Sequence, residues 1–135
     1  MAYLFDTDTI SAVVRPRPDL GVARRLAEVP AVEQFTSSVT LGELLFGALR
    51  RSRVDLLDRI LMLAKIVPVL PFDEAAAHRY AELRAELERL GTPLAEPDLR
   101  IASTALAFDL VLVTGNTRHF RRVPLLSVEN WIESP

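Results

Sequence analysis

Short apolar runs alternate with segments of helical periodicity along almost the whole chain, and this alternation restricts the fold more than any other feature. The runs that read as strands cover residues 2–5, 33–39, 67–72, 110–114 and 125–128. Apolar residues at helical spacing predict helices over residues 19–29, 40–51, 54–66, 73–90 and 97–108. Strands that alternate with helices are typical of a three-layer α/β fold, with a small, mostly parallel sheet flanked by helices. We expect one domain spanning residues 1–135.

The composition is that of an ordinary globular protein. Hydrophobic residues make up 50% and charged residues 25% of the 135 residues, and the net charge is -2. Without cysteine, disulfides and thiolate metal sites are excluded, which suits a reducing cytoplasm. We see no secretory signal, and the longest apolar stretch, residues 60–70, is interrupted by Lys65 and Pro68. A cytoplasmic protein without a membrane span is therefore expected.

Polar residues follow the predicted strands at the positions where each strand ends. Asp6 and Asp8 come directly after the first strand, and Glu43 lies one turn into the helix after the second. Asp98 begins the helix that precedes the fourth strand, which is followed by Asn116 and His119. Because ligands of parallel sheets collect beyond the carboxyl ends of the strands, we expect these side chains to meet. Several carboxylates at one edge predict a site for a hard divalent cation.

Each acid also has a structural interpretation. Asp6 or Asp8 can cap the helix that follows, and we assign the cap to Asp8. Glu43 stands three residues after Thr40, which is the spacing of a capping box. Asp98 differs, because helical spacing places it on the apolar side of its helix, in line with residues 101, 102 and 105. A carboxylate on that side needs a cation, a proton or a donor, which favours a functional role.

The opening residues 4–10, LFDTDTI, resemble the first motif of the haloacid dehalogenase-like phosphatases. In that family the first aspartate becomes phosphorylated and the second acts as acid and base. The family also requires an acid pair after a late strand, where this chain has Gly115 and Asn116. Its phosphate-binding cation is missing too, since the only lysine, Lys65, lies at the end of an apolar helix. Covalent phosphoryl chemistry is therefore the weaker interpretation.

Four segments in order resemble the PIN-domain ribonucleases, and specifically the VapC toxins of bacterial toxin–antitoxin pairs. These segments are YLFDTDTIS, SSVTLGELLFGA, GTPLAEPDLRIASTALAFDLVLVTGN and RHFRRVPLLSVENW. The resemblance implies a PIN-like fold and an endoribonuclease that depends on Mg²⁺ or Mn²⁺. By position, Asp6, Glu43 and Asp98 match the catalytic acids of the family. Asp6 and Asp98 would hold the metal, and Glu43 would complete the pocket or activate water.

One departure from the family concerns a fourth acid, which many members carry after the fourth strand. Here the corresponding positions hold Asn116 and His119. Asparagine can bind a metal or water through its carbonyl oxygen, and histidine can contact phosphate or assist proton transfer. Glu96, two residues before Asp98, is a further accessory candidate for the missing carboxylate.

Arginines near the strand ends are candidates for RNA binding, chiefly Arg118, Arg121 and Arg122, because most contacts of this kind are to phosphates. The other candidates are Arg15, Arg17, Arg50 and Arg51. Antitoxin contacts or plain surface solubility explain the same arginines equally well.

The resemblance implies a structured substrate such as tRNA or rRNA and a cognate VapB-like antitoxin that inhibits the enzyme. It also implies a homodimer, which can form a heterotetramer or larger assembly with the antitoxin. The alternative is a non-catalytic, metal-containing module that binds RNA or protein.

Overall fold

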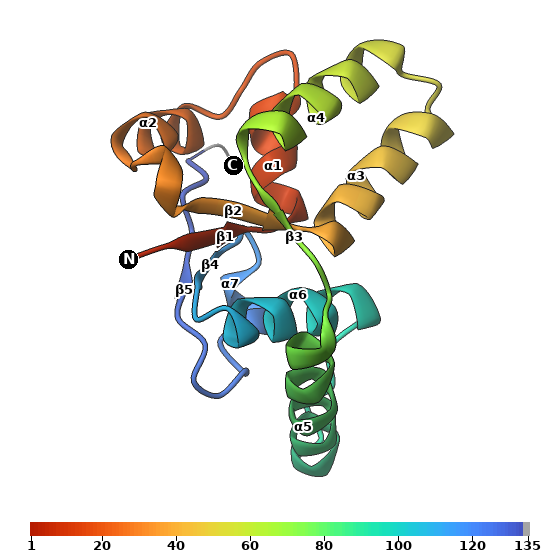
Figure 1. Cartoon of the computed structure of the whole chain (residues 1–135), viewed down its shortest axis with the longest axis vertical. Helices are drawn as coiled ribbons and strands as arrows, with labels where there is room; N and C mark the ends of the chain where they lie inside the picture. Colours follow the sequence, from red (N-terminus) through yellow and green to blue (C-terminus); the bar gives the residue numbers. More distant parts are fainter. Residues whose placement is uncertain (134–135) are drawn as a thin grey trace.

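The strands of the computed structural model, which describes residues 1–133, lie side by side in one parallel sheet (Figure 1). They are β1 (Tyr3–Phe5), β2 (Gln34–Ser37), β3 (Val69–Leu70), β4 (Val111–Val113) and β5 (Val128–Glu129). Their order across the sheet is β3-β2-β1-β4-β5, and every neighbouring pair is parallel. The predicted α/β fold with a small parallel sheet is therefore confirmed.

Helices connect the strands, close to where apolar spacing predicts them. They are α1 (Thr7–Val14), α2 (Leu20–Glu28), α3 (Ser38–Arg50), α4 (Val54–Ile66), α5 (Glu74–Leu90), α6 (Glu96–Ala107) and α7 (Thr117–Phe120), with a 3-10 turn at Ala31–Glu33. The bounds of α4 match the prediction of 54–66. Helix α1 is not among the helices that apolar spacing predicted. Strand β3 is shorter than predicted, with two paired residues instead of six, because Pro68 and Pro71 flank them and proline lacks the N–H that a ladder needs.

Successive residues of β1 pack into two separate hydrophobic cores. Tyr3 and Phe5 of β1 pack among residues of α1, α2, α3 and α4, whereas Leu4 between them packs against α5 and α6. This is the alternation that a strand imposes on its side chains. Figure 1 shows the corresponding layers, with α1 to α4 above the sheet and α5 to α7 below it. Trp131 closes the upper core through edge contacts with Tyr3 and Phe5, at ring distances of 5.1 and 5.3 Å.

The strand order reverses between β1 and β4. From β1 the chain moves to β2 and β3 on one side, and then returns to place β4 and β5 on the other. The Asp6 N–H donates to the Val113 carbonyl at 3.0 Å, which ties the ends of the two strands together. Parallel α/β sheets bind their ligands at such a reversal, so we expect the functional site among the residues around Asp6.

Within residues 1–133, no helix combines the length and the apolar character that crossing a membrane requires.

Candidate functional site

Asp6 lies at the centre of the strand reversal and is buried, with 4% of its surface exposed. It is the N-cap of α1, because its carboxylate accepts the Thr9 N–H at 2.9 Å. Burial raises the pKa of Asp6 from 3.8 to about 6; hydrogen bonds from Thr114 and Thr9 oppose this shift, and the charge of Asp8 adds to it. The assignment of the cap to Asp8 was therefore wrong.

Asp8 does not cap α1, and its side chain is exposed in the first turn of that helix. It lies beside the loop after β4, since a Cβ on Gly115 would be 3.7 Å from its carboxylate oxygen. Its negative charge raises the pKa of both Asp6 and Asp98. Asp8 is thus a fourth carboxylate of the site; the sequence placed it at this edge of the sheet, but we did not choose it as a catalytic or metal-binding residue. The signal was the two-residue spacing of Asp6 and Asp8, because only one of them can cap the same helix.

Glu43 comes from the second turn of α3, on the exposed side of that helix. The N-cap of α3 is Ser37, whose hydroxyl accepts the Thr40 N–H at 3.0 Å, so the expected capping box between Thr40 and Glu43 does not form. The Glu43 carboxylate instead accepts a hydrogen bond of 2.6 Å from the Thr7 hydroxyl of α1. This contact holds Glu43 toward the end of β1.

Asp98 is half-buried in the first turn of α6, on the side that the helical spacing predicts. Its pKa is raised above the ordinary value, first by burial and then by the charges of Glu43 and Asp8. The charge of His119 lowers it. The structure therefore places Asp98 close to acids of α1 and α3, as the sequence predicted for both Asp8 and Glu43.

Asn116 and His119 lie just beyond β4 and contact each other. The Asn116 side-chain amide and His119 Nδ1 are 2.7 Å apart, and the Asn116 N–H donates to the buried Thr114 hydroxyl at 2.9 Å. Since the charge of His119 lowers the pKa of Asp98, the pair of Asn116 and His119 lies beside the acids, on the side of α7.

Glu96 is not brought into this group. Its carboxylate accepts hydrogen bonds from the Tyr80 hydroxyl, from Arg84 at 3.0 Å and from Arg100 at 3.1 Å, all on the surface of α5 and α6. These three donors hold Glu96 on the α5 side of the helix, and they lower its pKa.

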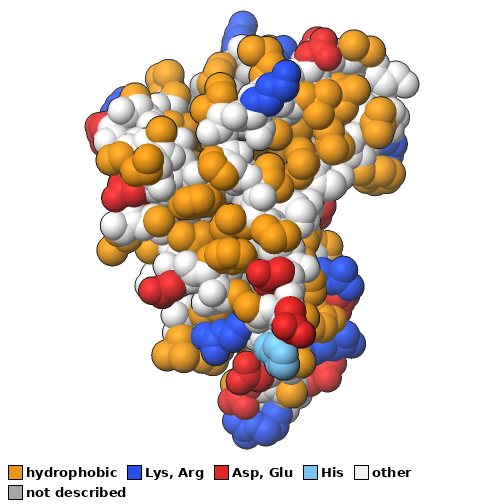
Figure 2. Space-filling model, viewed as in Figure 1, with side chains coloured by type: hydrophobic (Ala, Val, Ile, Leu, Met, Phe, Trp, Pro, Cys, Tyr) orange, Lys and Arg blue, Asp and Glu red, His pale blue; other side chains and the backbone are white. Residues whose placement is uncertain are grey.

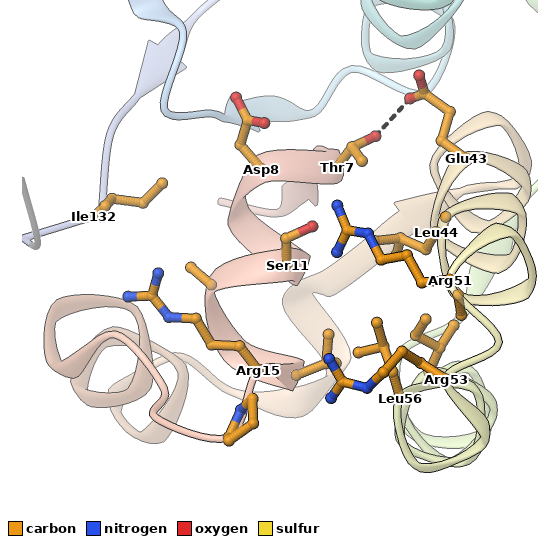
Figure 3. Close-up of a pocket in the computed structure, with 16 residues that line it drawn as sticks. Thr7, Asp8, Ser11, Arg15, Glu43, Leu44, Arg51, Arg53, Leu56 and Ile132 are labelled. Carbon is orange, nitrogen blue, oxygen red and sulfur yellow. Dashed lines mark hydrogen bonds between the residues drawn. The ribbon is translucent and has the colours of Figure 1, made fainter.

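A pocket of about 490 Å³ adjoins the acids, between α1, α3 and α4 (Figure 3). Asp8, Thr7 and Glu43 line one end of it. The remaining lining residues are Ser11, Ala12, Val14, Arg15, Pro16, Leu44, Gly47, Ala48, Arg51, Arg53, Leu56, Ile60 and Ile132. The acids thus lie at the mouth of a cavity large enough for a small ligand.

The donor set has the chemistry of a site for a hard cation. The charges of Glu43 and Asp8 raise the pKa of Asp98, and the charge of Asp8 also raises the pKa of Asp6. A divalent cation among these carboxylates would therefore relieve their repulsion. Within residues 1–133, no three acid or histidine side chains already surround a common metal position. The residue types fit Mg²⁺ or Mn²⁺, and the ligand assignments remain predictions.

The candidate RNA-binding arginines lie in two places. Arg118, Arg121 and Arg122 are exposed on α7 and just after it, beyond the end of β4. Of the earlier four, Arg15 and Arg51 line the pocket beside the acids, whereas Arg17 and Arg50 do not. The first group thus lies near the acids on the side of α7, and Arg15 and Arg51 lie near them in the pocket.

Comparison with known proteins shows what this arrangement is similar to. The family model described as the PIN domain matches residues 3–126. The tRNA(fMet)-specific endonuclease VapC of Salmonella typhimurium is 32% identical over 132 residues, covering 97% of this chain and 98% of the relative. Ribonuclease VapC2 of Haemophilus influenzae is also 32% identical, covering 98% and 99%. The solved structure of VapBC2 from Rickettsia felis, bound to a DNA fragment from its promoter, superposes with a TM-score of 0.86 at 30% identity, covering 97% and 99%.

Proposed function

This chain belongs to the PIN-domain family and to its VapC branch, and on that premise we propose that it is a metal-dependent endoribonuclease toxin held in check by an antitoxin. The observation that carries the proposal is the meeting of acids from separate segments at the strand reversal. Burial and the charges of Glu43 and Asp8 raise the pKa of Asp98, which is the signature of carboxylates crowded around one place. Such crowding is useful where a cation must be held.

In this proposal Asp6 and Asp98 hold the metal, with Asp8 beside them as a further carboxylate. Mg²⁺ or Mn²⁺, when bound, activates water and stabilises the negative charge that develops on the phosphate and the leaving oxygen. Glu43, oriented by the Thr7 hydroxyl, accepts a proton from the attacking water. The water oxygen would form a new bond to phosphorus as one P–O bond of the RNA backbone breaks, and the leaving oxygen would take up a proton from solvent, with no covalent intermediate on the protein.

His119 and Asn116 have a separate place in the proposal. They border Asp98 from α7, and their mutual contact of 2.7 Å orients the imidazole. We assign them to contact with the cleaved phosphate, together with the neighbouring Arg118. The substrate class follows the relatives named as tRNA(fMet)-specific endonucleases, so initiator tRNA is the first RNA to try.

The antitoxin partner has a surface available for it. Large apolar side chains of α3 and α4 are exposed, including Phe46 at 63%, Met62 at 64% and Ile66 at 70%. Figure 2 shows apolar side chains covering the upper right of this face, over α3 and α4. Exposed apolar area of this kind is typical of a protein-binding surface. We propose that a VapB-like antitoxin covers it, since the similar solved structures include complexes named VapBC.

The test of the function uses labelled initiator tRNA and labelled total RNA, incubated with the purified chain in Mg²⁺, in Mn²⁺ and in EDTA. Discrete fragments are expected with either metal and none in EDTA. Replacing the 2′-hydroxyl at the cut nucleotide by hydrogen should leave cleavage intact, because water is the nucleophile. Binding of RNA without fragments under any of these conditions would instead support the non-catalytic module.

A further inference from the structure

The pocket beside the acids is lined by charged and by apolar side chains. Its mouth carries the carboxylates of Asp8 and Glu43, and its floor is apolar. The buried floor residues are Ala12, Val14, Leu44, Ala48 and Ile60. The arginines Arg15, Arg51 and Arg53 also line the pocket. A ligand that fills it must therefore combine an apolar body with a negatively charged group.

Arg51 differs from the other two arginines of the pocket. Arg53 is committed to Asp55 through two hydrogen bonds, at 2.9 and 2.7 Å. Arg15 donates to the Arg17 carbonyl and forms an ion pair with Asp19. Within residues 1–133, the guanidinium of Arg51 makes no hydrogen bond and no ion pair, and Figure 3 shows it extending from α3 across the pocket toward α1. It presents its donors to whatever enters.

We propose that this pocket binds the nucleotide next to the cleaved phosphodiester, with its base on the apolar floor and its phosphate on Arg51. The inference rests on the proposed ribonuclease function and states where the RNA strand continues beyond the acids. A guanidinium offers paired N–H donors that match phosphate oxygens. The cavity of about 490 Å³ is within the range of small-ligand sites, which a nucleotide requires.

The chemistry of the pocket argues for RNA as the occupant. A nucleotide carries a phosphate and a flat base on the same ribose. The pocket offers the Arg51 guanidinium and an apolar floor beside the proposed metal-binding acids. An apolar peptide would satisfy the floor and leave Arg51 unpaired.

The first test compares two arginines, one inside the pocket and one far from it. Arg51→Ala removes the proposed phosphate contact, and Arg89→Ala is the control, since it removes the same charge in the last turn of α5, outside the pocket. Both are made in the Asp98→Asn chain, and binding of labelled tRNA(fMet) transcript is measured across a salt series. Arg51→Ala should weaken binding about tenfold and flatten the salt dependence by roughly one phosphate contact. Arg89→Ala should change neither.

The second test fills the pocket instead of removing a charge. Gly47 lines the pocket, Gly42 does not, and a Cβ added to either meets nothing within 4 Å. Both lie in α3, so Gly47→Leu and Gly42→Leu should each strengthen the helix. In otherwise unchanged chains, Gly47→Leu should raise KM for tRNA cleavage about tenfold or more, whereas Gly42→Leu should not.

The outcomes separate this proposal from the function on which it rests. If the unchanged chain cleaves RNA but Arg51→Ala and Gly47→Leu behave like their controls, the nucleotide site is wrong and the ribonuclease stands. If those two variants lose only inhibition by the cognate antitoxin, the pocket belongs to the protein partner and the proposal is overturned. If the unchanged chain neither binds nor cleaves RNA, both proposals fail.

Discussion

The Thr7 hydroxyl donates a hydrogen bond of 2.6 Å to the carboxylate of Glu43, and so joins the first turn of α1 to α3. Thr7 stands between Asp6 and Asp8, so the residue that orients Glu43 comes from the same short segment as two other acids. The arrangement of the site therefore depends on a neutral residue as well as on its carboxylates.

Replacement of Thr7 tests the orientation of Glu43. Thr7→Val keeps the shape of the side chain and removes the donor, so we expect RNA cleavage about tenfold slower, the value of one hydrogen bond to a charged group. Thr7→Ser keeps the hydroxyl and should restore most of the rate. Single-turnover cleavage measures both. Equal rates for the valine and serine variants would show that the contact does not matter for cleavage.

The buried charge on Asp6 should make the metal-free protein less stable as pH rises. Its pKa is about 6 in the folded chain against an ordinary 3.8, so the folded state keeps its proton longer than the unfolded state. Stability from this group is complete below pH 3.8, decreases as pH rises, and is lost above pH 6, by about 3 kcal/mol.

Asp6→Asn separates this cost from the helix cap, because asparagine caps helices as well as aspartate does. In EDTA at pH 7 we expect the variant to have a higher free energy of unfolding than the unchanged chain, by up to about 3 kcal/mol. The difference should vanish near pH 4. Urea denaturation at both pH values measures it, and a less stable variant at pH 7 would contradict the buried-charge assignment.

Divalent metal should stabilise the folded chain through Asp6 and Asp98. At a concentration ten times its dissociation constant, Mg²⁺ should add about 1.4 kcal/mol and raise the Tm by a few degrees at pH 7. The shift should be smaller at pH 5, where protons compete for the carboxylates. Asp98→Asn should lose most of it. A Tm shift of the same size in that variant would place the metal elsewhere.

Glu96 offers a contrast to Asp98 at the start of the same helix. Because Tyr80, Arg84 and Arg100 hold its carboxylate on the α5 side, we expect Glu96→Gln to change the cleavage rate less than twofold. Mg²⁺ titration of cleavage should give the same midpoint as in the unchanged chain. A large loss of metal affinity would instead make Glu96 the missing ligand.

Much of the fold could be predicted from the sequence because the pattern of apolar residues is local and strong. The helix over residues 54–66 was predicted to the residue, since its apolar spacing is uninterrupted and Pro68 follows it closely. The inward side of Asp98 also followed from spacing along one helix. Both features depend only on residues within a few turns of each other.

The predictions that were wrong concern contacts between segments that are distant in the sequence. Whether Asp6 or Asp8 caps α1 depends on where β1 ends, and the pairing of β1 with β4 decides that. The partners of Glu96 come from α5, whose packing against α6 no local pattern specifies. Asp8 was assigned to the cap and not to the site for the same reason, because its effect on Asp98 acts across two segments.

If the acids at the strand reversal cleave RNA, two matched variants should differ in single-turnover cleavage of initiator tRNA. Asp98→Asn removes an acid of the site, and Asp58→Asn makes the same change on an exposed position of α4 outside the pocket. We expect Asp98→Asn to reduce the Mg²⁺-dependent rate by about 100-fold or more, and Asp58→Asn to leave it unchanged. Equal rates in the two variants would show that the cleavage does not come from this site.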